Sequence, residues 1–210
     1  MSDKSTAKAS YIKEYFDDLK RRIAFLSELD GMRRKDEALM LCCCYIEALG
    51  SRRSQEPEWK AKNYCDVLAE HGRNEIWPLI HPKKIKNVLS SNGLFGSAFP
   101  ALAPLIDGFG MRLMEPQEVQ TQVDAALNEQ QRAWLKVHIF KGSIAYISYE
   151  RIRSELVHDI SAAPISFSET SYKGNPVPDL NFEMLYVALR NIVEISERDA
   201  ITTNRWWFEQ

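Results

Sequence analysis

The residues from Tyr149 to Asp159 are the part of the chain best suited to chemistry. In this run, Y-E-R-I-R-S-E-L-V-H-D, Arg153 precedes His158 by five positions, and Arg151 lies two residues before Arg153. Histidine titrates near neutral pH and can act as an acid or a base. Arginine stays charged and donates two N–H groups to phosphate oxygens. The pair suits cleavage of RNA without a metal, in which the ribose 2′-oxygen attacks the neighbouring phosphate.

Most of the chain around this run is predicted to be helical, because apolar residues recur every three or four positions. No segment alternates with a period of two, so no sheet is expected. The fold class expected is all-α, a helical bundle in which prolines and glycines make the middle of the chain irregular. The predicted helices span 7–29, 34–49, 57–71, 82–89, a stretch from 116, 140–160 and 181–197, and a loop covers 161–180.

Glycines and capping residues set the expected ends of these helices. Gly50 is expected to end the second helix, which leaves Arg52 and Arg53 in the turn that follows. Asn181 is expected to cap the last helix. On the first two helices, Tyr11 and Ala48 are among the residues expected to face the core.

On an α-helix from 140 to 160, the apolar stripe would pass through Ile152 and Leu156. At 100° per residue, Arg151 and Arg153 would flank this stripe on opposite sides, and His158 would lie on the Arg151 side. None of the three would face the core of its own chain. The reaction needs an acid, a base and a cation, and one arginine with one histidine does not provide all three. Two copies related by a two-fold axis provide two arginines and two histidines. We therefore expect a homodimer.

The run resembles the signature of the HEPN superfamily (higher eukaryotes and prokaryotes nucleotide-binding), which is Arg, four to six residues, then His. I-R-S-E-L-V-H-D is similar to the form Arg-Ser-x-x-Val-His of the stand-alone and ApeA-like branches. Met40–Gly50 is similar to an early HEPN helix in which an acidic residue, here Glu47, follows an apolar run. Two positions depart from common patterns: Ser154 follows the arginine, and Ile160 replaces a tyrosine found in one branch.

The resemblance implies a single HEPN-like helical domain over 1–210, with 76–136 as a family-specific elaboration. It also implies a metal-independent RNA endonuclease in defence, stress or toxin–antitoxin biology, formed as an antiparallel homodimer with RNA as substrate and a cognate antitoxin or regulator as a further partner. Arg153 and His158 would carry the catalysis, supported by Arg151, Ser154 and Glu47. Two alternatives stay open: a non-catalytic HEPN-like nucleotide-binding or protein-interaction module, and an unrelated helical scaffold.

A structural role for the same residues is also open. Arg151 and Glu155 are four positions apart and could form a surface ion pair. His158 near a helix C-terminus would favour the helix dipole. His71, His81 and His138 are expected to be structural, and Trp206 and Trp207 are expected to pack on the core or on a partner chain.

Composition limits the partners and cofactors. The net charge is −2, with 27 basic and 29 acidic residues, so non-specific coating of nucleic acid is excluded and any RNA contact must be local. Cys42, Cys43, Cys44 and Cys65 lack metal-ligand spacing. We therefore expect no metal and no cofactor, and buried free thiols typical of a reducing cytoplasm. No apolar stretch approaches the ~20 residues of a membrane span, and no signal peptide is expected.

Overall fold

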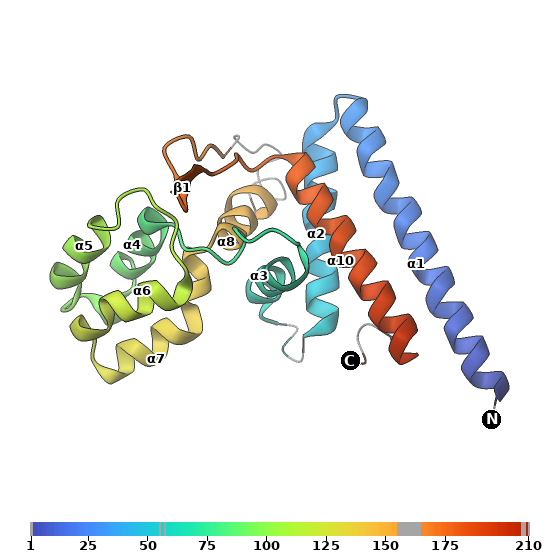
Figure 1. Cartoon of the computed structure of the whole chain (residues 1–210), viewed down its shortest axis with the longest axis horizontal. Coiled ribbons are helices and arrows are strands. Elements are labelled where there is room, and N and C mark those ends of the chain that lie inside the picture. Colours follow the sequence, from blue (N-terminus) through green and yellow to red (C-terminus); the bar gives the residue numbers. More distant parts are fainter. Residues whose placement is uncertain (1, 55, 57, 155–164, 207–208, 210) are drawn as a thin grey trace.

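The computed structural model describes residues 2–54, 56, 58–154, 165–206 and 209, and these are mostly helical (Figure 1). The all-α prediction is confirmed at this level. A short antiparallel hairpin was not expected: β1 (Ser171–Tyr172) pairs with β2 (Asn175–Pro176). Within the described residues, no helix combines the length and the apolar character needed to cross a membrane.

The larger hydrophobic core lies among the long helices, which form the right-hand part of Figure 1. There α1, α2 and α10 run side by side, and α3 packs against α2 and α10. Each helix buries one apolar stripe, which is the arrangement that stabilises a helical bundle. The elements of this first lobe are α1 (Ser2–Gly31), α2 (Lys35–Arg53), α3 (Lys60–His71), α8 (Ile144–Ser148), η4 (Tyr149–Ser154) and α10 (Phe182–Thr203).

Helix α2 does not end at Gly50, as the sequence suggested, but continues to Arg53. The glycine is required by packing instead, because a Cβ at this position would lie 2.5 Å from the carbonyl oxygen of Asn63 in α3. Because α2 continues past Gly50, Arg52 and Arg53 lie in its last turn and not in the turn after it. The prediction failed because glycine also serves as a contact point between helices.

Two side chains that were expected to face the core, Tyr11 and Ala48, do not. Tyr11 is 63% exposed and Ala48 is exposed, whereas Ile12, Phe16 and Ile46 are fully buried. In α1, Ile12 and Phe16 continue the stripe formed further along by Leu19, Ile23 and Leu26 with the same three- and four-residue steps, so the true apolar face is offset by one residue at its start.

A second, separate core lies among the short helices on the left of Figure 1. The prolines that open α4 and α6 occupy their first helical positions, as predicted, since a missing N–H is harmless there. Asn128 caps α7 with a reciprocal capping box to Gln131. The elements of this second lobe are α4 (Pro82–Ser90), η1 (Gly93–Phe95), α5 (Phe99–Asp107), α6 (Pro116–Val123), η2 (Asp124–Ala126), α7 (Glu129–His138) and η3 (Ile139–Gly142).

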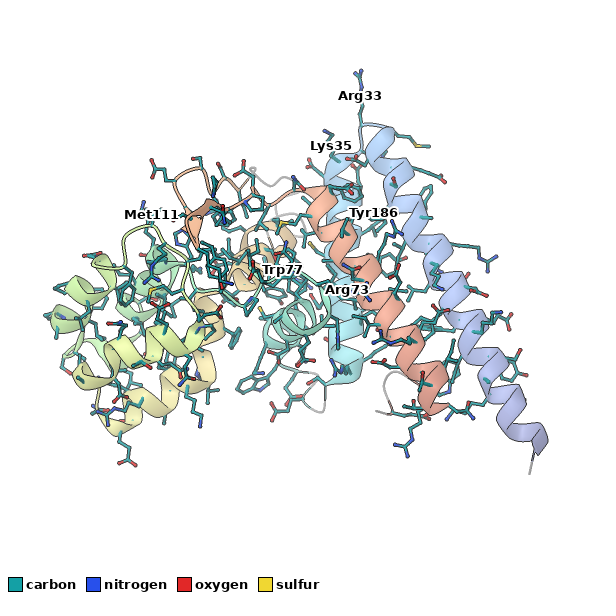
Figure 2. The ribbon with its side chains drawn as sticks, in the orientation of Figure 1. Arg33, Lys35, Arg73, Trp77, Met111 and Tyr186 are labelled. Atoms are coloured by element: carbon teal, nitrogen blue, oxygen red, sulfur yellow. The ribbon has the colours of Figure 1, made fainter. Side chains whose placement is uncertain are left out.

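Backbone hydrogen bonds tie together the segments in which the chain passes from one core to the other. The N–H of Ile80 donates to the carbonyl oxygen of Met114 at 2.8 Å, and the N–H of His81 donates to that of Gly142 at 2.9 Å. Trp77, labelled near the middle of Figure 2, is fully buried beside this junction. The expectation that 76–136 forms an elaboration stays a prediction, although most of this segment belongs to the second core.

The predicted helix from 140 to 160 is wrong over its described part. Residues 139–154 form three short elements, η3, α8 and η4, of which η4 is a π-helix. Ser143 starts a new helix by accepting a hydrogen bond from the N–H of Tyr146. Gly142 allows a tight contact, because a Cβ there would lie 2.9 Å from the Cβ of Ile85. Residues 155–164, which include Glu155, Leu156, His158 and Ile160, lie outside the described residues, as does Trp207.

Candidate functional site

The π-helix η4 carries the described part of the Arg–His run. A π-helix closes its hydrogen bonds between residues five apart, so each turn holds more residues than an α-helical turn. The hydroxyl of Ser154 donates to the carbonyl oxygen of Tyr149, five residues earlier, at 3.3 Å. Arg151 is exposed, Ile152 is buried and Arg153 is half-buried. Arg153 therefore lies at the edge of the buried face, next to Ile152, although the 3.6-residue period from which its position was predicted does not apply in a π-helix.

Arg153 pairs with Glu47 of α2, a residue 106 positions away in the sequence. Its Nη2 donates to Glu47 Oε1 at 3.3 Å, and its Nε lies 2.6 Å from Oε2. The second approach is an ion-pair contact without hydrogen-bond alignment, because neither Nε nor Oε2 has a hydrogen-bond partner among the described residues. The side chains are 21% and 13% exposed, respectively. Removing either partner would leave a largely desolvated charge, which costs more than a surface pair is worth.

Aromatic rings support Arg153 from beneath. Its guanidinium carbon lies 5.5 Å from the ring centroid of Tyr149, within cation–π range. Tyr149 packs in turn on Tyr64, with centroids 5.3 Å apart. The fully buried Tyr64 hydroxyl donates to Cys43 Sγ at 3.6 Å and lies 3.2 Å from the Ser148 hydroxyl, which can donate to it. This stack fixes the position from which Arg153 projects.

The cysteines do not supply a nucleophile to this site. Burial raises the pKa of the Cys43 thiol to about 12 and raises those of Cys42 and Cys65 well above the usual value. Burial also raises the pKa of the half-buried Cys44. All four are free, as predicted, and protonated thiols are poor nucleophiles. In the part of the chain that the structure describes, no group of three or more His, Cys, Asp or Glu residues is arranged to hold a metal ion.

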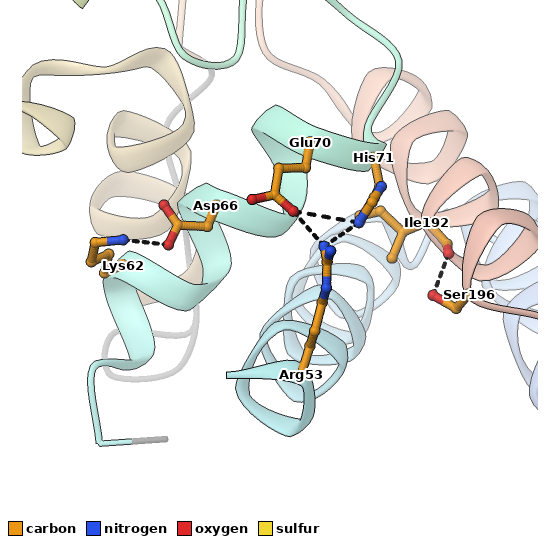
Figure 3. Close-up of polar contacts among 7 residues, drawn as sticks. All are labelled: Arg53, Lys62, Asp66, Glu70, His71, Ile192 and Ser196. Carbon is orange, nitrogen blue, oxygen red and sulfur yellow. Dashed lines mark hydrogen bonds and ion pairs between the residues drawn. The ribbon is translucent and has the colours of Figure 1, made fainter. Parts of the chain in front are cut away.

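A second polar cluster joins the end of α2 to the end of α3 (Figure 3). Arg53 Nη1 contacts both Glu70 Oε2 and His71 Nε2. Since the guanidinium only donates, His71 Nε2 must accept, and the ring is therefore neutral. Burial, and then the charge of Arg53, lowers the pKa of His71. The cluster borders a cavity of about 220 Å³ that is also lined by Gly50, Asn63 and Asp66. Its histidine keeps the structural role expected from the sequence.

Stability should therefore fall in mild acid. The pKa values of His71 and His81 are both lowered, chiefly by burial, so between these values and the unfolded value of about 6.5 the unfolded chain binds more protons. The free energy of unfolding should decrease as the pH drops below about 6.5. Glutamine in His71→Gln still offers an acceptor to Arg53 but cannot titrate. The free energy of unfolding of this variant should therefore depend less on pH than that of wild type. Urea unfolding followed from pH 7.5 to 5 would measure this; an unchanged dependence in the variant would contradict it.

The structure brings together some of the residues selected from the sequence. Glu47 and Arg153 meet where α2 packs against η4. Ser154 instead bonds to the carbonyl oxygen of Tyr149, and Arg151 is exposed. His158 lies outside the described residues. Tyr149 and Tyr64, which support the arginine, were overlooked as site residues. The signal for Tyr149 was its position four residues before Arg153, but Tyr64 reaches the site only through tertiary packing.

Comparison of the chain with known protein families, with curated proteins and with solved structures finds no match.

Proposed function

We propose that this protein is a metal-independent RNA endonuclease of the HEPN type, active as a two-fold homodimer. The observation that carries the proposal is the contact between Arg153 and Glu47. The family resemblance selects these two residues from distant segments, and the fold places them in one half-buried pair. They lie beside a π-helical turn, a feature that is frequent at functional sites. Defence, stress or toxin–antitoxin biology, with an antitoxin or regulator as partner, is part of the same proposal.

Each residue has a distinct part in the proposed reaction. His158 transfers protons, as the base that activates the ribose 2′-hydroxyl in one chain and as the acid for the leaving 5′-oxygen in the other. Arg153 stabilises the negative charge that develops on the phosphate. Glu47 engages Nε and Nη2 of the guanidinium, which orients it and leaves the N–H groups of Nη1 to grip a phosphate oxygen. Arg151 and Ser154 act in support.

One observation favours a second candidate function, that of a non-catalytic HEPN-like binding module. The carboxylate of Glu47 already neutralises Arg153, so the pair could serve mainly to hold α2 against η4. In that case the chain would bind a nucleotide or a protein without cutting RNA. The two functions differ in whether the wild-type protein cleaves RNA.

The test uses purified protein, single-stranded RNA and an excess of chelator. We expect products with a 2′,3′-cyclic phosphate and a 5′-hydroxyl, because the internal 2′-oxygen is the nucleophile. DNA of the same sequence lacks this oxygen and should stay intact. Mass spectrometry of the product ends would identify the chemistry. Cleavage that requires a divalent metal ion, or equal cleavage of DNA, would rule out the proposed mechanism, and no cleavage at all would favour the binding module.

A further inference from the structure

A polar cleft lies where α4 and α7 of the second lobe face η3, α8 and η4. Its volume is about 560 Å³, within the range of roughly 300–1,000 Å³ usual for ligand sites. Asn87, Ser91 and Asn92 contribute hydrogen-bonding groups to its wall. The remaining lining residues are Lys84, Val88, Gly93, Trp134, Lys141, Tyr146 and Glu150.

Two lysines of the cleft are held against aromatic rings. Lys84 Nζ lies 5.3 Å from the ring centroid of Tyr146, and Lys141 Nζ lies 5.8 Å from that of Trp134. Trp134 is itself fixed by a parallel stack on His138, with centroids 4.3 Å apart, and by the buried ring of Phe95. Contacts of this kind hold an ammonium group in place before a ligand arrives. The cleft therefore presents positioned positive charge from two elements.

A carboxylate balances part of this charge. Glu150 forms an ion pair with Lys84. Two lysines and one glutamate leave one net positive charge among the lining residues. A ligand phosphate that contacts Lys84 must compete with Glu150, whereas one that contacts Lys141 meets no such competition from the residues lining the cleft. An anionic ligand is favoured, and its affinity is limited by Glu150.

Two tyrosines connect the cleft wall with the Arg153–Glu47 pair. Tyr146 stacks on Tyr149, with centroids 6.3 Å apart, and Tyr149 lies against the guanidinium of Arg153. Glu150, in the cleft wall, belongs to the same π-helix as Arg153. A chain of phosphates in the cleft would thus continue past two tyrosines to Arg153, which suits a strand better than a single nucleotide.

We propose that this cleft binds the backbone of single-stranded RNA next to the phosphate that Arg153 contacts, with Lys84 and Lys141 as its phosphate ligands. The choice of RNA rests on the proposed function, but binding and cleavage can be measured separately. The second lobe would then supply part of the substrate-binding surface. Because Glu150 opposes Lys84, its removal should strengthen binding.

The test measures binding of a fluorescent oligouridylate with 2′-O-methyl groups throughout, which has no nucleophile and cannot be cleaved. Fluorescence anisotropy is followed at several salt concentrations. We expect Lys84→Ala and Lys141→Ala each to weaken binding about three- to fivefold. Each should also lower the slope of log affinity against log salt by about 0.7, the value for one contact to a single strand. Glu150→Gln should tighten binding. Lys13→Ala, which removes an exposed charge from α1, is the matched control and should bind as wild type does.

Circular dichroism establishes that each variant is folded. Wild-type-like binding by both cleft lysine variants, an equal loss in Lys13→Ala, or weaker binding by Glu150→Gln would overturn the inference. If uridine monophosphate competes as strongly as the oligomer, the cleft binds a single nucleotide and not a strand, and the inference is overturned. If unmodified RNA is not cleaved but the variants bind as expected, the ribonuclease proposal fails and the binding site stands. If RNA is cleaved but the lysine variants bind as wild type does, the binding-site proposal fails and the ribonuclease proposal stands.

Discussion

Replacing His158 with alanine is expected to lower the rate of RNA cleavage by about 10²–10⁴-fold, the usual contribution of a positioned acid or base. The reason is chemical: alanine can neither take the proton of the 2′-hydroxyl nor return one to the leaving oxygen. Single-turnover cleavage of labelled RNA in the presence of a chelator measures the effect on the chemical step. Wild type should lose activity on the acidic side as the histidine that acts as base becomes protonated.

His71→Gln is the matched control, because it removes a histidine that accepts a hydrogen bond from Arg53 at the C-terminal end of α2. This variant should cleave RNA at the wild-type rate. If His158→Ala retains full activity while folded, His158 is not the proton-transfer group. If His71→Gln is inactive instead, the reaction belongs to a different site.

The second large effect is expected at Arg153. Arg153→Ala removes the cation that stabilises the phosphate and leaves Glu47 largely buried without its ion-pair partner. We expect a loss of cleavage of about 10²–10³-fold and a loss of about 1–3 kcal/mol in the free energy of unfolding. Arg151→Ala removes an exposed side chain from the same turn, so it should lower the cleavage rate and the free energy of unfolding much less. Rates of cleavage and urea unfolding curves would measure the two losses.

Two further variants separate catalysis from folding. Arg153→Lys keeps a positive charge for Glu47 but loses the planar fork, so it should be stable yet cleave poorly. Glu47→Gln keeps an acceptor for Nη2 but weakens the orientation of the guanidinium, so its rate should fall less than that of Arg153→Ala. If Arg151→Ala abolishes cleavage and Arg153→Ala does not, Arg151 is the true motif arginine and our assignment is wrong.

Elements whose structure depends on neighbouring residues could be predicted from the sequence. Asn181 caps α10 by accepting a hydrogen bond from the N–H of Met184, as expected. In the same helix the residues that recur every three or four positions, Leu185, Ala188, Leu189, Ile192 and Ile195, are all buried. A cap and a periodic stripe act within one helix, so the sequence contains the information needed to find them.

Features that depend on tertiary packing could not be predicted in this way. Gly50 allows α3 to approach α2, and the helix expected from 140 is interrupted at Gly142 and Ser143. Both glycines lie against residues that are distant in the sequence, Asn63 and Ile85 respectively. Residues 149–154 form a π-helix, to which the 3.6-residue period used for the prediction does not apply. The sequence resemblance selected Glu47 and Arg153, but neither their contact nor the support from Tyr64 followed from any spacing. The cleft beside α4 and α7 lies largely in a segment with no recognised motif.

The two separately filled cores have a consequence for how this protein opens. Each lobe buries its own apolar residues, and the chain passes from one core to the other near Ile80, Met114 and Gly142. Native proteins often open in cooperative units of this kind, each with its own free energy. Amide protons of α5 and α6 would then exchange with solvent independently of those in α2 and α10. A change in the short helices would alter how often the proposed RNA-binding cleft is formed while leaving the arginine pair in place.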